Sequence, residues 1–110
     1  MIRDVVAASG LLSRSGSSPA DLPAKPIVYI FDTVTLDGPD RLSYDAPPPA
    51  IARHQVRLEL YAPREDDEAE SALEKQLLLA GLLFTKSPRE WVPAVQRYSV
   101  VYELSYTLKI

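Results

Sequence analysis

Apolar residues recur with different periods along the chain, and each change of period marks the boundary of a predicted element. In residues 27–36, Ile27 and Tyr29 would share one face of a strand, and Val28 and Ile30 would share the other. A strand that is apolar on both faces is typical of one covered on both sides. We therefore predict a buried strand over this segment.

Two later segments alternate strictly between apolar and polar positions. Residues 54–62 place Val56, Leu58, Leu60 and Ala62 on one face, and we predict that the opposite face is exposed to solvent. Residues 98–108 alternate in the same way except at Val101, and residues 82–86 form a shorter apolar run ahead of a turn region over residues 87–96. We predict two strands here, joined as a hairpin across that turn region.

The period changes to that of a helix over residues 65–80. Its apolar stripe consists of Ala69, Ala72, Leu73, Gln76, Leu77 and Ala80. Acidic residues crowd the first turns, where they favour the positive end of the helix dipole, and either Asp66 or Asp67 has the position of the N-cap. Gly81 suits the left-handed residue that ends a helix, and residues 1–8 predict a second, short helix.

Residues 9–26 and 37–53 are rich in Pro, Gly and Ser, and we predict flexible loops for both. The elements then follow the order α-β-β-α-β-β. This order favours an α+β fold, with an antiparallel sheet of about four strands and the helices packed on one face.

Composition narrows the possible functions. The 110 residues of 12.2 kDa, 46% hydrophobic and 25% charged, suit a single domain over residues 1–110. A net charge of −3 and a pI near 5.1 argue against a dedicated nucleic-acid binder. No apolar run approaches the ~20 residues that span a bilayer, so we expect no membrane association. The chain contains no cysteine, which excludes disulfides and thiolate chemistry.

The sequence offers little catalytic chemistry. An enzyme would have to rely on Asp32, His54 and Glu59, and His54 is the only histidine. No nucleophile motif or phosphate-binding loop accompanies them, and the acidic run at residues 65–68 lacks the spacing of a calcium loop. We expect no enzyme activity, no catalytic residues, no cofactor and no bound metal.

Four residues are candidates for a protein–protein interface. Arg57, Glu59 and Tyr61 occupy the predicted exposed face of one strand, and aromatic residues are enriched in interfaces. For the charged residues on such faces, ion pairing between strands is the simpler expectation. Trp91, in a turn between prolines, is either a residue of a small satellite core or an interface anchor.

The order of these cues resembles a known family. It comprises a strand after Pro26 that contains Tyr29, a strand Val56–Tyr61, an acidic helix that ends at Gly81, and a final strand with Tyr102-Glu103. Over about residues 20–106, this pattern is similar to the small tail-completion or tail-terminator proteins of long-tailed bacteriophages, also called tail-to-head joining proteins.

The resemblance implies a non-enzymatic structural protein of the virion, assembled in the host cytoplasm. It implies a hexameric ring that contacts the tail tube protein and the head connector protein, with a channel through which DNA passes without specific binding. The mild acidity is compatible with such a channel, because binding of DNA requires neutralised phosphates. The alternative from element order alone is a small ferredoxin-like binding or regulatory module.

Overall fold

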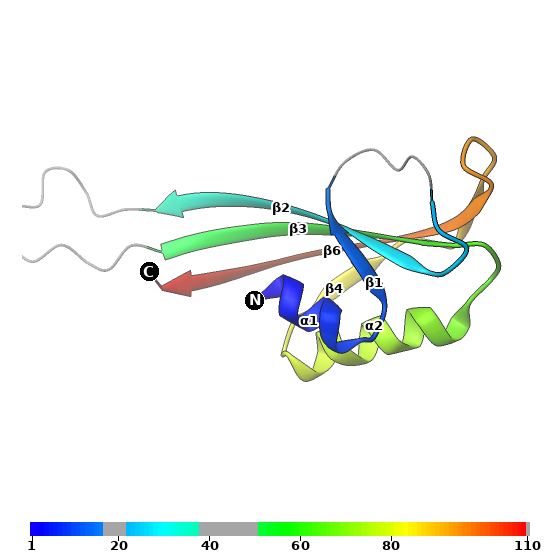
Figure 1. The fold of residues 1–110 in the computed structure, drawn as a ribbon. Coiled ribbons are helices and arrows are strands. Elements are labelled where there is room, and N and C mark those ends of the chain that lie inside the picture. Colours follow the sequence, from blue (N-terminus) through cyan, green and yellow to red (C-terminus); the bar gives the residue numbers. More distant parts are fainter. Residues whose placement is uncertain (17–21, 38–50, 110) are drawn as a thin grey trace, which may run out of the picture.

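The computed structural model describes residues 1–16, 22–37 and 51–109, in two helices and one sheet (Figure 1). In chain order the elements are α1 (Ile2–Ala8), β1 (Leu12–Ser15), β2 (Ile27–Asp37), β3 (Ile51–Ala62), α2 (Asp67–Leu79), β4 (Phe84–Lys86), β5 (Glu90–Val92) and β6 (Arg97–Lys109). The strand order is β1-β2-β3-β6-β4, and β5 also pairs with β6.

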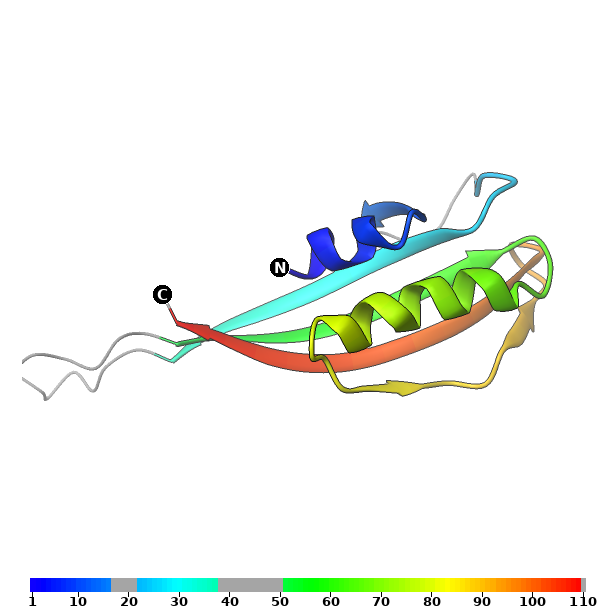
Figure 2. The same cartoon turned by 90° about the horizontal axis from the view of Figure 1, so that it is seen from below.

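The α+β class and the two helices are confirmed, and both helices cover the same face of the sheet (Figure 2). The prediction of about four antiparallel strands is wrong in detail. The sheet has six strands and is mixed, because β1 runs parallel to β2 from Leu12, opposite Ile27, to Ser15, opposite Ile30. The other pairs among the described strands are antiparallel, and β4 and β6 form the predicted hairpin contact.

The predicted loops contain more regular structure than expected. β1 lies within the predicted loop 9–26, and β5 lies within the predicted turn 87–96. The predicted loop 37–53 is too long, because Asp37 pairs with Ile51 and the β2–β3 ladder continues to that point. Residues 17–21 and 38–50 of the predicted loops lie outside the described residues.

The main core lies between the helices and the sheet. Leu73 and Leu77 of α2 and Val6 of α1 are fully buried against the even-numbered residues of β3 and β6, such as Leu58 and Tyr102. The predicted helix stripe is therefore confirmed in its central residues. The N-cap is Asp66, whose side chain accepts a hydrogen bond from the Ala69 N–H at 3.0 Å, and Gly81 has the expected positive φ of 74°.

The opposite face of the sheet, here called the open face, carries no helix among the described elements. Where β2 begins, this face holds a small second hydrophobic cluster of Ile27, Tyr29 and Tyr61, against which Leu22 and Val95 pack. β2 is therefore covered on both faces over its first residues, as its sequence predicted.

Three strands continue past β1 and β4 as an arm, whose first residues lie under the helices and whose end extends beyond them (Figure 1). We define the arm as residues 31–37 of β2, 51–57 of β3 and 105–109 of β6, which remain in continuous register with one another. β1 ends opposite Ile30, and β4 ends opposite Leu104. Among the described residues, no strand lies beside the outer edges of the arm.

Candidate assembly interface

Three of the four predicted interface residues lie together on the open face of β3. Arg57 Nε is 2.9 Å from Glu59 Oε2, and the Tyr61 hydroxyl donates a hydrogen bond of 2.8 Å to Glu59 Oε1. The Glu59 carboxylate is thus held by two residues of its own strand. Arg57 does not form the expected ion pair with a neighbouring strand; it binds Glu59 of the same strand instead.

The prediction that this face of β3 is exposed is wrong for two residues. Glu59 and Tyr61 are each only 9% exposed, because the second cluster covers this end of the open face and Tyr29 packs edge-on against Tyr61 at 5.8 Å. The side chain of Arg57 remains 54% exposed. Of the three residues, Arg57 alone can meet a partner without rearrangement.

The buried cluster changes the acidity of Tyr61. Burial and the adjacent Glu59 carboxylate, as both hydrogen-bond acceptor and negative charge, raise the pKa of Tyr61 from 10.0 to about 12. The Tyr61 hydroxyl therefore remains a proton donor to Glu59 throughout the physiological pH range.

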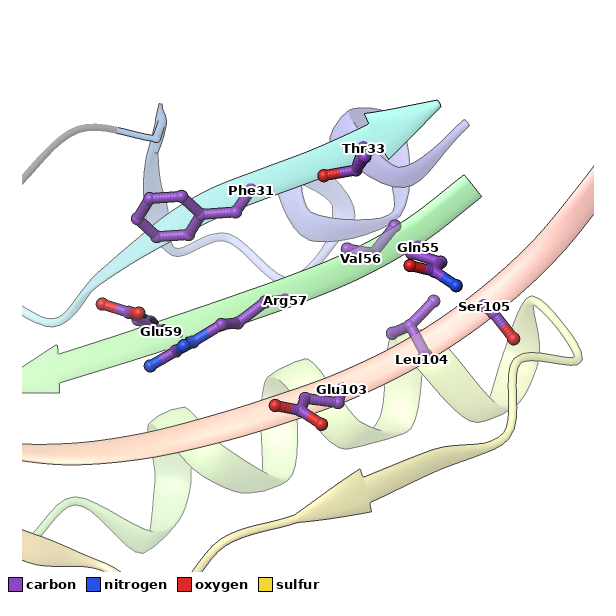
Figure 3. Close-up of a pocket in the computed structure, with 9 residues that line it drawn as sticks. All are labelled: Phe31, Thr33, Gln55, Val56, Arg57, Glu59, Glu103, Leu104 and Ser105. Carbon is purple, nitrogen blue, oxygen red and sulfur yellow. Dashed lines mark ion pairs between the residues drawn. The ribbon is translucent and has the colours of Figure 1, made fainter. Parts of the chain in front are cut away.

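Beside these residues, the open face forms a shallow hollow of about 590 Å³ (Figure 3). It runs across β2, β3 and β6 from the body of the protein into the arm. Glu103 lies opposite Arg57 in the register of β6 with β3, and among the described side chains it has no ion-pair partner. The lining residues are Phe31, Thr33, Gln55, Val56, Arg57, Glu59, Glu103, Leu104 and Ser105.

Trp91 lies apart from the other three predicted residues. It stands on β5, opposite Tyr98 of β6, and contacts the Tyr98 ring at 4.9 Å. Tyr98 pairs with Ala62, whereas Tyr61 pairs with Ser99, so Tyr98 and Tyr61 lie on opposite faces of the sheet. Trp91 pairs with Tyr98 and therefore lies on the helix-covered face. With 48% of its surface exposed, it combines a contact to one aromatic neighbour with an accessible ring.

The three residues considered for an enzyme do not form one cluster. The Nδ1 atom of His54 is 3.0 Å from the Asp32 carboxylate, and the His54 ring stacks on Tyr106 at 4.5 Å. Both residues face the helix-covered side of the arm, whereas Glu59 is on the open face. Successive side chains of β3 point to opposite faces of the sheet, so the even-numbered His54 and the odd-numbered Glu59 lie on different faces.

Sequence reasoning missed a second charged cluster, which joins α2 to the β4–β5 segment. Glu70 is 6% exposed and binds both Lys86, at 2.8 Å, and Arg89, at 2.6 Å. The acidic residues at this helix start were interpreted as one group that favours the helix dipole, and Glu70 was not distinguished from them. The signal was present in its spacing, because Glu70 precedes Leu73 by three residues and Leu77 by seven, on the buried stripe.

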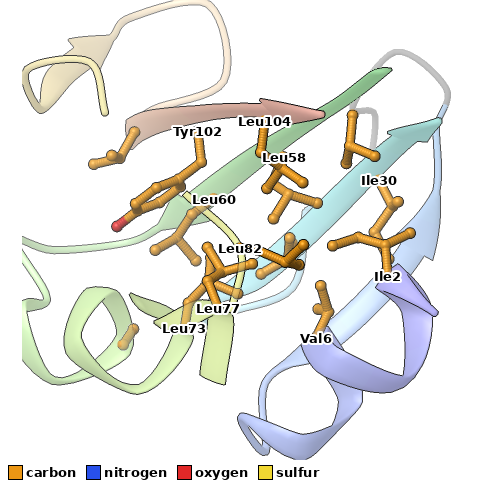
Figure 4. Close-up of a cluster of buried hydrophobic side chains, with 14 residues drawn as sticks. Ile2, Val6, Ile30, Leu58, Leu60, Leu73, Leu77, Leu82, Tyr102 and Leu104 are labelled. Atoms are coloured by element: carbon orange, nitrogen blue, oxygen red, sulfur yellow. The ribbon is translucent and has the colours of Figure 1, made fainter. Parts of the chain in front are cut away.

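The region between the helices and the sheet is filled by side chains rather than open to a ligand (Figure 4). Within residues 1–16, 22–37 and 51–109, no three His, Asp or Glu side chains gather as a set of metal ligands. No helix of the described chain is long and apolar enough to cross a membrane.

Comparison with known proteins identifies no family for this sequence. No protein-family model matches the sequence, and no curated protein matches it.

Proposed function

We propose that this protein is a non-enzymatic structural protein that assembles into a ring, of the tail-completion or tail-terminator type found in long-tailed bacteriophages. In this role it would join the tail tube protein to the head connector protein as a hexamer in the virion, after assembly in the host cytoplasm. DNA would pass through its channel without specific binding.

The observation that carries the proposal is the arm. A three-stranded sheet whose end projects beyond its helices, with no described strand on either edge, exposes unpaired backbone donors and acceptors. On the helix-covered side of the arm, Val34, Leu36 and Leu108 are 47%, 65% and 39% exposed. Apolar side chains and strand edges that are free in one chain are features that a neighbouring chain can bury.

A second apolar patch supports assembly through more than one contact. Leu78 and Leu79, at the end of α2, are 61% and 70% exposed, and Leu83 is 85% exposed. This patch and the arm lie on different elements of the chain. Two unlike patches on one chain suit the head-to-tail contacts from which rings are built.

The alternative of a small ligand-binding module would need a hollow that can hold the ligand. Because side chains fill the space under the helices, a ligand would occupy a hollow elsewhere: the one on the open face near Phe31 and Glu103, or one of about 510 Å³ on the arm beside His54 and Tyr106. A retained small molecule in native mass spectrometry of the purified protein would favour this alternative.

The oligomeric mass of the purified protein tests the proposal. Light scattering over a wide concentration range should give a mass near six chains, and negative-stain images should contain rings. Because some assembly proteins associate only with a partner, the protein should also be mixed with tail tube protein. A monomer at every concentration, with no binding to the tube, would contradict the proposed function.

A further inference from the structure

We infer that the outer edge of β2 in one copy pairs, in parallel, with the outer edge of β6 in the next copy. The paired segments are residues 31–37 and 105–109, and the arms of neighbouring copies form one continuous sheet. This inference rests on the proposed ring and identifies the surface that would build it. It follows from the direction of the backbone groups on the two edges.

On β2, the outward groups belong to even-numbered residues. The Gly16 N–H, which follows β1, donates a hydrogen bond of 2.6 Å to the Ile30 carbonyl. Because successive residues of a strand direct their backbone groups to alternate sides, Val34 and Leu36 also direct theirs away from β3. β1 stops opposite Ile30, so among the described residues no strand receives these groups.

On β6, the outward groups belong to odd-numbered residues. The Val101 carbonyl accepts a hydrogen bond of 2.8 Å from the Ser87 N–H, and the Val101 N–H donates one of 2.9 Å to Ser87 Oγ. The same alternation directs the backbone groups of Ser105, Thr107 and Lys109 outward. β4 stops opposite Leu104, which leaves this second edge without a described partner.

The two alternations determine which pairing keeps the faces of the sheet continuous. In a parallel pair, a residue whose backbone groups point outward lies beside one whose groups point inward. Thr107 would then lie beside Thr33 or Thr35, which share the open face with it. The helices of every copy would remain on the same side of the shared sheet.

In an antiparallel pair, two residues with outward-directed groups lie opposite each other. Thr107 would meet Val34 or Leu36, which belong to the helix-covered face. Each copy would then be related to its neighbour by a rotation of a half-turn about the axis that runs across the strands of the shared sheet. The helices would lie on opposite sides of the sheet in successive copies. Repetition of that half-turn gives an open fibre rather than a ring.

Pairing of like edges is also less complete. Two β6 edges, or two β2 edges, can pair about a twofold axis, but such a contact stops at two copies and leaves the other edge of each copy free. Parallel pairing of β2 with β6 satisfies both edges of every copy by one repeated contact. A ring closed in this way contains no free arm edge.

The side chains beside the two edges suit this contact. On the open face, small hydroxyl residues adjoin both edges: Thr33 and Thr35 on β2, and Ser105 and Thr107 on β6. On the opposite face, pairing brings Leu108 of one copy beside the exposed Val34 or Leu36 of its neighbour. The contact therefore buries apolar surface on one side and leaves a polar surface on the other.

Disulfide crosslinking tests the inference, because the natural chain has no cysteine. Thr35→Cys would be combined in turn with Ser105→Cys, Thr107→Cys or Lys109→Cys, which samples three registers. Within one chain, β3 separates β2 from β6, so Thr35 is roughly 9–10 Å from Thr107 and farther from Ser105 and Lys109. This separation is too long for a disulfide, and any disulfide must join two copies.

We expect at least one of the three double variants to give, on oxidation, a covalent ladder that extends to the mass of the ring. The matched control is Thr35→Cys with Leu108→Cys, which places the thiols on opposite faces and should give no ladder. Each single-cysteine variant should remain uncrosslinked. Circular dichroism of every variant confirms that the chain is folded.

The other outcomes overturn the inference in distinguishable ways. A ring mass in light scattering without a ladder from any of the three double variants would reject the edge contact and retain the proposed function. Covalent dimers from a single-cysteine variant would show that like edges pair. A monomer at every concentration, alone and with tail tube protein, would reject both the contact and the function.

Discussion

The guanidinium of Arg89 holds the buried carboxylate of Glu70, with Arg89 Nη2 2.6 Å from Glu70 Oε2. Arg89 also contacts Asp67, and Lys86 binds Glu70 from the end of β4. These contacts attach the irregular segment between β4 and β5 to α2, although its own strands are three residues long. Hydrogen bonds to Asp67 and Glu70 raise the pKa of Arg89, so its guanidinium stays charged.

Removal of Glu70 should therefore destabilise the fold. We expect Glu70→Ala to lower the free energy of unfolding by about 1–3 kcal/mol, because charge-assisted hydrogen bonds are lost at a buried site. Glu68→Ala is the matched control, since Glu68 is exposed on the same turn and should change stability by less than about 0.5 kcal/mol. Urea denaturation measures both variants. Equal effects would show that Glu70 contributes only helix-dipole stabilisation.

Arg57 and Glu59 should differ although they form one ion pair. Arg57→Ala removes an exposed partner and should cost no more than about 1 kcal/mol. Glu59→Ala leaves the buried Tyr61 hydroxyl without its acceptor and should cost about 1–3 kcal/mol. Charge reversal at Arg57 therefore suits a test of assembly, whereas reversal at Glu59 would also destabilise the fold. Urea denaturation of the two alanine variants checks the difference, and equal costs would contradict the burial of Glu59.

The pKa of Tyr61 predicts a loss of stability at high pH. Its folded value of about 12 exceeds the unfolded value of 10.0, so its contribution to stability is fully present below pH 10 and is lost as pH rises through 12. Tyr61→Phe should reduce the slope of unfolding free energy against pH between 10 and 12. Burial and the nearby Glu74 carboxylate also raise the pKa of Tyr102. Its contribution to the pH dependence of stability should therefore remain in this variant.

A titration of phenolate absorbance provides the independent check for Tyr61. Glu59→Gln removes the negative charge beside the hydroxyl and should lower the pKa of Tyr61 towards 10, and Tyr61→Phe should remove that late-titrating group altogether. If the two variants leave the late phase of the titration unchanged, the Tyr61–Glu59 hydrogen bond does not control this pKa.

Two adjacent leucines separate folding from assembly. Leu83 is 85% exposed, so Leu83→Ser should change the free energy of unfolding by less than about 0.5 kcal/mol while it weakens association in light scattering. Leu82 is 5% exposed in the core, and Leu82→Ala should instead cost about 2–5 kcal/mol. If Leu83→Ser associates as strongly as the natural protein, Leu83 does not belong to the proposed interface.

The elements with a strong hydrophobic period could be predicted from sequence. The double-sided pattern of β2, the stripe of α2 and the alternation of β6 each describe residues that pack in the core. β1 could not be predicted, because Leu12–Ser15 are all exposed and this edge strand is defined by its pairing with β2. Local pattern carries no information about such a long-range pairing.

The candidate interface was predicted less well, for a related reason. Alternation shows that Glu59 and Tyr61 share a face with Arg57, but it cannot show which part of that face is covered. Residues far along the chain, Leu22 and Val95, cover it. Trp91 was grouped with these residues only by its chemical type, and the register of β5 with β6 places it on the other face.

The arm has a mechanical consequence for association. β2, β3 and β6 contain neither glycine nor proline, and each runs without interruption from the core into the arm. No glycine or proline between core and arm provides a hinge, so in the proposed ring the arm would meet its neighbour already in its bound shape. The entropy lost on docking is then small, because little chain must be ordered. The same continuity means that a load applied to the end of the arm is transmitted directly to the strands beneath the helices.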